Sequence, residues 1–186
     1  MDKHLTKLSK FLSLILRHKP QVIGLKLDAN GWADVNELVD LVNLHGISIS
    51  HPLLDLVVSS NDKERFTYNS DRTKIRAQQG HSLDVDLGLI PQPPPQKLFH
   101  GTATRFLSSI QEQGLLPGTR QHVHLTAKEV DAIKVGQRHG QSVVLTVKAA
   151  EMNQAGYHFY CSDNGVWLTA TVPPEYIRFP SKLHRP

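Results

Sequence analysis

The residues best suited to chemistry in this sequence are arginines that stand beside histidines or on short strands. Arg17 precedes His18 near the end of an amphipathic segment, and Arg138 precedes His139 near the end of another. Arg76 lies in a short segment of alternating residues. A guanidinium group is permanently charged and can grip a phosphate with two parallel hydrogen bonds. These arginines therefore suggest a site for a phosphate or a similar anion.

Each of these cations also has an ordinary structural explanation. Arginine and histidine are favoured in the last turn of a helix by the helix dipole, which accounts for Arg17, His18 and Arg138. On an alternating strand Arg76 faces away from Ile75, so it could simply be solvated. Taken one at a time, the residues leave both explanations open.

A second group of candidate residues lies later in the chain. His100-Gly101-Thr102 is expected where a strand ends and a helix begins. Glycine there would let a ligand approach the backbone, while the histidine and threonine offer directional hydrogen bonds. In His122-Val123-His124-Leu125-Thr126, the two histidines share one face of a predicted strand and the two apolar residues share the other.

Neither a metal nor a familiar nucleotide-binding loop is indicated. His122 and His124 could share a metal ion, but no acidic or cysteine ligand stands at a useful spacing. The sequence has no Rossmann glycine motif and no phosphate loop of the Walker type. A bound dinucleotide would need another architecture.

The first half of the chain predicts three helices and a hairpin. Apolar residues recur at helical spacing from Leu5 to Leu16, and Pro20 ends this helix. Helices are also expected from Asp34 to Leu44 and from Ser50, as N-cap, to Ser60. Strands are expected at 65–68 and 74–77. This order is a winged-helix outline.

The second half predicts an α+β arrangement with a mixed sheet. Helices are expected at 105–113 and 127–138. Strands are expected at 98–100, 122–125, 142–147, 166–169 and 176–179. The proline-rich run 91–95 reads as a stiff connector. We therefore expect an N-terminal lobe over 1–90, a connector over 91–96 and a C-terminal lobe over 97–186.

Composition limits the class of protein without deciding its function. The 186 residues are 39% hydrophobic and 20% charged, which is typical of globular proteins. A formal net charge of +4 is compatible with a polyanionic partner but does not require one. Cys161 is the only cysteine, so no internal disulfide forms. No membrane span or signal peptide is recognised, and a cytoplasmic monomer is expected.

Taken together, the motifs resemble the RNA (tRNA) 2′-phosphotransferase family, in this order and over nearly the whole chain. The resemblance is carried by the segments 9–20, 28–33, 75–82, 99–102, 122–126, 135–140 and 164–169. Among them are Leu16-Arg17-His18-Lys19-Pro20, Arg76-Ala77-Gln78-Gln79-Gly80-His81-Ser82 and Phe99-His100-Gly101-Thr102.

The resemblance implies both a fold and a reaction. The expected fold is a winged-helix lobe joined to a lobe of the ADP-ribosyltransferase type, with the substrate between them. The expected reaction transfers a splice-junction 2′-phosphate from a tRNA-like RNA to NAD, which serves as co-substrate. Its products are RNA with a 2′-hydroxyl, nicotinamide and ADP-ribose 1″,2″-cyclic phosphate, and no metal is needed.

The resemblance also assigns roles to residues. The essential basic set falls on Arg17, His18, Arg76 and Arg138. NAD is expected to contact His100, Gly101, Thr102, His124, Leu125, Thr126 and Val166. Independently of the resemblance, Lys19 and Lys74 are candidate contacts to RNA phosphates. His81 and Ser82 follow the Arg76 strand and could either reach an NAD phosphate as substrate contacts or merely close the interface between the lobes.

One position departs from many ADP-ribosyltransferases, which place a glutamate on the strand that here reads Gly165-Val166-Trp167. A phosphate dianion is already a competent nucleophile and needs no such base. An alternative is an ADP-ribosyltransferase that acts on phosphorylated nucleic-acid ends or another phosphorylated acceptor. A non-enzymatic winged-helix binder is disfavoured, because segment 50–60 contains no Lys or Arg.

Overall fold

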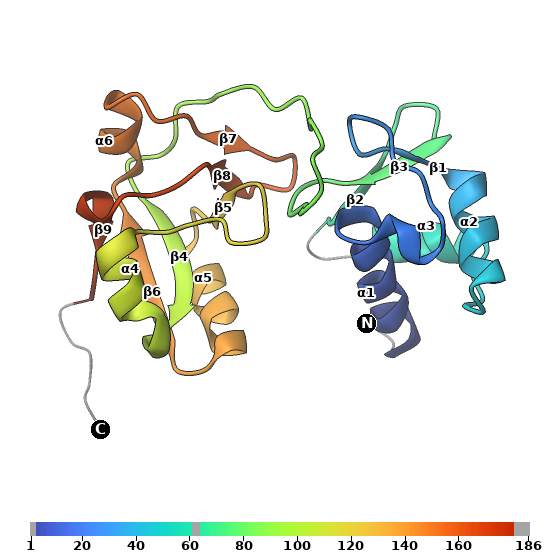
Figure 1. Cartoon of the computed structure of the whole chain (residues 1–186), viewed down its shortest axis with the longest axis horizontal. Helices are drawn as coiled ribbons and strands as arrows, with labels where there is room; N and C mark the ends of the chain where they lie inside the picture. Colours follow the sequence, from blue (N-terminus) through green and yellow to red (C-terminus); the bar gives the residue numbers. More distant parts are fainter. Residues whose placement is uncertain (1–2, 61–63, 181–186) are drawn as a thin grey trace. The chain divides into compact units, whose positions relative to one another are not determined.

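The computed structural model describes residues 3–60 and 64–180, and the chain divides into two compact units, Met1–Gly88 and Leu89–Pro186 (Figure 1). Each unit has its own hydrophobic core. Both combine helices with small antiparallel sheets, as an α+β protein does. No helix of the described residues is long and apolar enough to cross a membrane.

Unit 1 contains the predicted helices and hairpin. Helix α1 (Lys3–Arg17) buries Leu8, Leu12 and Leu16, and Pro20 begins a 3-10 turn, η1 (Pro20–Val22), after it. Helix α2 (Val35–Leu44) is capped by Asp34, which accepts a bond from the Glu37 amide. Helix α3 (His51–Ser59) is capped by Ser50, as expected.

The three helices pack against a small sheet. Strands β2 (Phe66–Tyr68) and β3 (Lys74–Ala77) form the predicted hairpin, and β1 (Ala33–Asp34) pairs with the other edge of β3. In the hairpin register, Thr67 lies opposite Arg76, on the face away from the buried Ile75. The core therefore lies on one side of β3, and Arg76 projects from the other.

Unit 2 is built on two three-stranded sheets. One has the order β4-β6-β9, with β4 (Leu98–Ala103), β6 (Ser142–Val147) and β9 (Ile177–Arg178). The other has the order β5-β8-β7, with β5 (Val123–Leu125), β8 (Trp167–Thr169) and β7 (Tyr160–Cys161). Reciprocal backbone bonds between Phe99 and Thr126 connect the two sheets. The pairs are antiparallel, so the expected mixed sheet is wrong.

Three α-helices and three 3-10 turns complete the described part of unit 2, which ends at residue 180. The α-helices are α4 (Leu107–Gln113), α5 (Glu129–Gly136) and α6 (Ala149–Gln154). The 3-10 turns are η2 (Thr104–Phe106), η3 (Gln137–His139) and η4 (Pro174–Tyr176). The helix expected over 127–138 is thus an α-helix that tightens into η3. The proline-rich run belongs to this unit, where the Gln92 amide donates to the Phe159 carbonyl.

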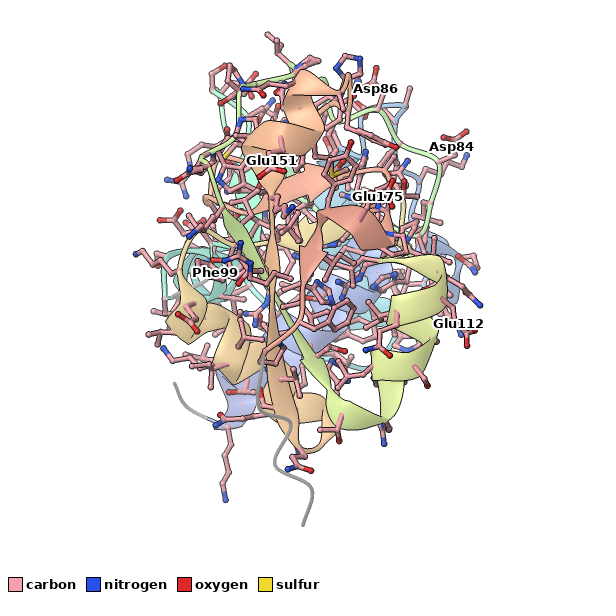
Figure 2. All side chains as sticks on the ribbon, turned by 90° about the vertical axis from the view of Figure 1, so that its left-hand side faces the viewer. Asp84, Asp86, Phe99, Glu112, Glu151 and Glu175 are labelled. Carbon is pink, nitrogen blue, oxygen red and sulfur yellow. The ribbon has the colours of Figure 1, made fainter. Side chains whose placement is uncertain are left out.

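Figure 2 looks onto one face of unit 2, on which three glutamates are labelled. Glu112 on α4, Glu151 on α6 and Glu175 on η4 are all exposed there. Lys148 Nζ lies 3.3 Å from Glu151 Oε2, so the charge of Glu151 is paired within the unit.

Candidate functional site

Arg76 is the candidate anion-binding residue of unit 1 whose side chain is best supported. Its guanidinium stacks over the Trp32 ring, 4.4 Å from the centroid. Its Nη1 lies 3.4 Å from the carbonyl oxygens of both Asn30 and Leu87, and its Nε is buried without a hydrogen-bond partner. Among the described residues no carboxylate pairs with Arg76. The side chain is therefore held in place while its charge stays available.

The loop before β1 builds the support for Arg76. Asp28 Oδ1 accepts bonds from the Asn30 and Trp32 amides at 3.0 and 2.9 Å, which is an Asx turn. The Asn30 side chain donates to the Asp86 carbonyl at 2.7 Å. These bonds fix both Trp32 and the Asn30 carbonyl beneath the guanidinium.

Arg17 and His18 lie at the end of α1, beside the segment that follows β3. Arg17 Nη2 is 3.5 Å from the Arg65 carbonyl, a long contact. His18 Nδ1 is 3.0 Å from Ser82 Oγ, and the Ser82 amide donates to the Arg17 carbonyl at 3.0 Å. Two predicted catalytic residues and one predicted substrate residue are therefore joined directly.

His81 lies beneath these cations and is only 1% exposed. Burial, together with the nearby charges of Arg17, His18 and Arg76, lowers its pKa from 6.5 to about 4. Neither ring nitrogen has a hydrogen-bond partner among the described residues. His81 is thus a neutral, buried residue inside the cationic cluster, and its contact with a substrate phosphate stays a prediction.

The two predicted lysine contacts differ in their surroundings. Lys19 is exposed at the end of α1. Lys74 Nζ lies 3.1 Å from Asp28 Oδ2, in an ion pair at the surface. The Lys74 charge is therefore shared with a protein carboxylate, as an ordinary structural role predicts.

His100 is the best-defined candidate of unit 2. Its Nδ1 donates to the His124 carbonyl at 3.0 Å, because a carbonyl oxygen can only accept. Burial lowers the pKa of His100, although that hydrogen bond opposes the change, and the charges of His139 and Arg120 add to the lowering. The neutral ring therefore carries its proton on Nδ1 and a lone pair on Nε2.

His124 is held within the same group. Its Nδ1 lies 3.0 Å from the His122 carbonyl and 3.5 Å from Arg120 Nη1. One nitrogen cannot donate to a carbonyl and accept from a guanidinium at once, so we assign the shorter contact, with Nδ1 as donor. Val123 and Leu125 are buried on the opposite face of β5, as predicted.

Gly101 does not have the environment expected for it. His100-Gly101-Thr102 lies inside β4, where all three pair with β6, rather than at a strand end. A methyl group on Gly101 would overlap the Ala132 carbonyl of α5. The missing side chain of Gly101 therefore makes room for the backbone of α5 rather than for a ligand. Thr102 is 6% exposed.

The other predicted NAD contacts have local structural roles. Thr126 Oγ1 accepts a bond from the Lys128 amide just before α5. The Val166 carbonyl accepts from both the amide and the hydroxyl of Ser162, in the turn that joins β7 to β8. Leu125 is 2% exposed and belongs to the core. Thr126 and Leu125 thus act through their side chains, and Val166 acts through its backbone carbonyl.

Arg138 lies in η3 and is exposed, with no hydrogen bond or ion pair to another described residue. Its neighbour His139 acts electrostatically on His100. Arg138 is therefore a free cation in unit 2, while Arg17, His18 and Arg76 gather in unit 1.

Two further features describe the site. Within the described residues, no group of three histidine, cysteine or carboxylate side chains could hold a metal ion. A hollow of about 420 Å³ in unit 1 is lined by Val58, Ser59, Glu64, Phe66, Thr67, Tyr68, Arg72 and Gln78. It includes none of the predicted site residues, so the cationic cluster is not that hollow.

Sequence reasoning missed three residues that the geometry brings into these groups. Trp32 and Asn30 support Arg76, and Arg120 lies beside His124. The first two fall in the quoted segment 28–33, whereas nothing in the spacing of Arg120 marked it.

Comparisons with known proteins identify the family of this chain. The family model described as RNA 2′-phosphotransferase, Tpt1 / KptA family, matches residues 3–171. The chain belongs to this family. The resemblance seen in the sequence motifs is thereby confirmed.

Individual relatives match over almost their full lengths. A probable RNA 2′-phosphotransferase of Flavobacterium johnsoniae is 53% identical over 182 residues, 97% of this chain and 100% of the relative. One from Acaryochloris marina is 54% identical over 177 residues, 95% of this chain and 98% of the relative. One from Escherichia coli (strain K12 / MC4100 / BW2952) is 51% identical over 179 residues, which cover 96% of this chain and 97% of the relative.

Proposed function

We propose that this member of the family is an NAD-dependent enzyme that removes an internal 2′-phosphate from RNA. Its products are RNA with a 2′-hydroxyl, nicotinamide and ADP-ribose 1″,2″-cyclic phosphate. The observation that carries the proposal is Arg76, in one cluster with Arg17 and His18. Its guanidinium is supported by Trp32 and pairs with no carboxylate in the part of the chain that the structure describes. Such a cluster binds a phosphate dianion through charge and directed hydrogen bonds.

The two units would divide the work. We interpret unit 1 as a winged-helix lobe that holds the RNA phosphate, since three helices and a hairpin follow in that order. We interpret unit 2 as a lobe of the ADP-ribosyltransferase type that holds NAD. The winged-helix order supports the first interpretation, and the His100–His124 group supports the second.

The residues of unit 2 suit NAD as a substrate. The neutral His100 ring has a lone pair on Nε2, which can accept a bond from a ribose hydroxyl. The exposed Arg120 supplies positive charge for a pyrophosphate. Thr102 shares the His100 face of β4, two residues along the strand. Gly101 has no part in this contact.

In the first step, an oxygen of the RNA 2′-phosphate bonds to the anomeric carbon of the nicotinamide ribose. The bond to nicotinamide breaks, and nicotinamide leaves as a neutral molecule with the bonding electrons. Arg17 and Arg76 offset the charge of the attacking phosphate and hold it for in-line approach. No general base is required, so the absence of a carboxylate at Gly165-Val166-Trp167 is consistent with the chemistry.

In the second step, the ribose 2″-hydroxyl bonds to phosphorus and releases its proton to solvent. The bond between phosphorus and the RNA 2′-oxygen breaks, and His18 gives that oxygen a proton. Arg138, which is free for substrate, stabilises the charge on the phosphoryl oxygens. Lys19 adds a backbone contact to the RNA, whereas Lys74 is already paired with Asp28.

The test is a product analysis by mass. A short RNA with one internal 2′-phosphate is incubated with the protein, with and without NAD. We expect NAD-dependent loss of phosphate and release of the cyclic phosphate product. Arg138→Ala should accumulate ADP-ribosylated RNA. Stable ADP-ribosylated RNA from the unmodified enzyme would instead indicate a transferase that stops after the first step, and unchanged RNA despite NAD binding would refute the proposal.

A further inference from the structure

We propose that Ser82 is a positioning residue that holds the His18 imidazole so that its Nε2 faces the reacting phosphate. The chemical part of this inference rests on the proposed function, in which His18 gives a proton to the departing RNA oxygen. The structural part stands on contacts within unit 1 alone. The sequence alone had left Ser82 open between a contact to an NAD phosphate and a part in closing the interface between the lobes.

Ser82 makes two contacts with consecutive residues at the end of α1. Its amide donates to the Arg17 carbonyl at 3.0 Å, and its Oγ lies 3.0 Å from His18 Nδ1. The backbone bond satisfies one of the carbonyls that every helix end leaves without a helical partner. Because the backbone of Ser82 is tied to residue 17, its side chain is held at a fixed distance from residue 18.

The residues just before Ser82 are held in place by packing against the interior of unit 1. Gly80 has φ of +89°, which glycine adopts readily, and the chain turns there so that His81 points into the core. His81 packs against Gly31, where a methyl group would lie 3.4 Å from His81 Nε2. A bulky, buried ring next to Ser82 therefore prevents the segment from swinging away from α1.

A serine hydroxyl at Nδ1 has a direct chemical consequence. When Ser82 Oγ accepts from Nδ1–H, the other nitrogen, Nε2, is the one that exchanges a proton. As the bond from phosphorus to the RNA 2′-oxygen breaks, the proton leaves Nε2 for that oxygen, and the electron pair stays on Nε2. The Nδ1–H bond to Ser82 persists before and after the transfer, so the ring need not turn.

The test compares Ser82→Ala and Ser82→Thr with Ser59→Ala as control. Ser59 is also exposed, but its hydroxyl bonds only carbonyls of its own helix, from Asp55 and Leu56. Two quantities are measured in the full-length protein. The first is the pair of ¹⁵N signals of the His18 ring, identified by their loss in His18→Gln, and the second is kcat and KM on the 2′-phosphorylated RNA.

We expect Ser82→Ala to shift the His18 signals towards a mixture of tautomers and to lower kcat about tenfold, the worth of one hydrogen bond to a charged group. KM for RNA should change less than about twofold, because Ser82 does not touch RNA. Ser82→Thr keeps a hydroxyl and should restore both readouts, and Ser59→Ala should alter neither.

Two results would overturn the proposal. One is a raised KM with unchanged kcat and unchanged His18 signals in Ser82→Ala, which would make Ser82 an RNA ligand. The other is His18 signals that are the same in all variants. If the unmodified enzyme does not act on the RNA, the proposed function fails, and the ¹⁵N signals alone still decide whether Ser82 orients His18.

Discussion

Arg76 shows how a neutral scaffold can keep a cation ready for a ligand. The indole of Trp32 and two carbonyl oxygens stabilise its guanidinium without neutralising it. Arg72, on the same hairpin, is instead paired with Asp55 at 2.7 Å. The two arginines therefore form a natural comparison between a cation proposed to bind the substrate phosphate and a cation paired within the protein.

We predict that Arg76→Ala lowers kcat/KM on 2′-phosphorylated RNA by at least about 100-fold. The loss corresponds to two hydrogen bonds between charged groups. Arg76→Lys should recover only part of the activity, because an ammonium group cannot bind two phosphate oxygens in parallel. Arg72→Ala, the matched control, should keep activity within about twofold. Equal losses from the two alanine variants, measured by initial rates, would contradict the assignment.

His81 predicts a loss of stability in acid. Its folded-state pKa of about 4 lies below the ordinary 6.5, because burial and neighbouring cations disfavour the charged ring. The unfolded chain therefore binds a proton first as the pH falls. The contribution of His81 to the free energy of unfolding is therefore fully present above pH 6.5. It declines as the pH falls towards 4, by roughly 3 kcal/mol in all.

The measurement for His81 is urea unfolding at pH 8, 6 and 4. His81→Phe should make the free energy of unfolding less dependent on pH between 6.5 and 4. His51→Phe, which alters an exposed histidine bonded to Asn36, should leave that dependence as it is. His100 and His122, whose pKa values burial also lowers, remain in both variants and so do not affect the comparison.

At the scale of elements, the junction of α5 with β4 explains Gly101. The backbone of α5 lies so close to β4 that only glycine fits at position 101. On the helix, Gly136 is close to the strand in the same way, because a methyl group there would overlap the Thr102 carbonyl oxygen. We predict that Gly101→Ala lowers the free energy of unfolding by about 3 kcal/mol, because a buried overlap with backbone cannot relax cheaply.

Gly118→Ala is the control for that prediction. Nothing lies within 4 Å of a methyl group there, and the φ of +65° costs about 1 kcal/mol. Chemical unfolding of both variants provides the comparison. If Gly101→Ala were as stable as the unmodified protein but had lost affinity for NAD, the packing explanation would be wrong. Gly101 would then contact the ligand, as the sequence suggested.

The elements also show what the sequence could predict. Long periodic patterns identified α1, α2 and α3, and proline and serine marked their ends. The two-residue strands β1 and β7 and the six-residue α6 were missed, because such short segments have no measurable period. Strand β4 was ended too early at its polar residues, since pairing with β6 overrides local polarity.

The candidate site was predicted less completely, for a related reason. The side-chain types identified Arg17, His18 and Arg76, and the structure brings these three around His81. Contacts to carbonyl oxygens, such as His100 to His124, leave no signal in the sequence, because every residue has a carbonyl. The supporting role of Trp32 likewise depends on the geometry of a turn. The spacing of residues in the sequence does not reveal that geometry.

At the scale of the whole molecule, each unit has its own core and its own tryptophan. Trp32 belongs to unit 1, beneath Arg76, and Trp167 belongs to unit 2, on β8 next to β5. The sequence contains no other tryptophan. The variant Trp167→Phe therefore keeps Trp32 as a fluorescent reporter of the cationic cluster in unit 1. The variant Trp32→Phe keeps Trp167 as a reporter of unit 2, the proposed NAD lobe.

We predict that NAD stabilises the unit reported by Trp167 and not the unit reported by Trp32. A ligand that binds only the folded state at 100 times its Kd adds about 2.7 kcal/mol to the unfolding free energy of the part that holds it. Urea titrations of the two single-tryptophan variants, each with and without NAD, measure this directly. Inorganic phosphate should do the reverse, since Arg17, His18 and Arg76 all belong to unit 1. An NAD effect seen only through Trp32 would exchange the roles of the units. Equal shifts through both reporters would mean that the two cores unfold as one, because binding to either then stabilises the whole chain.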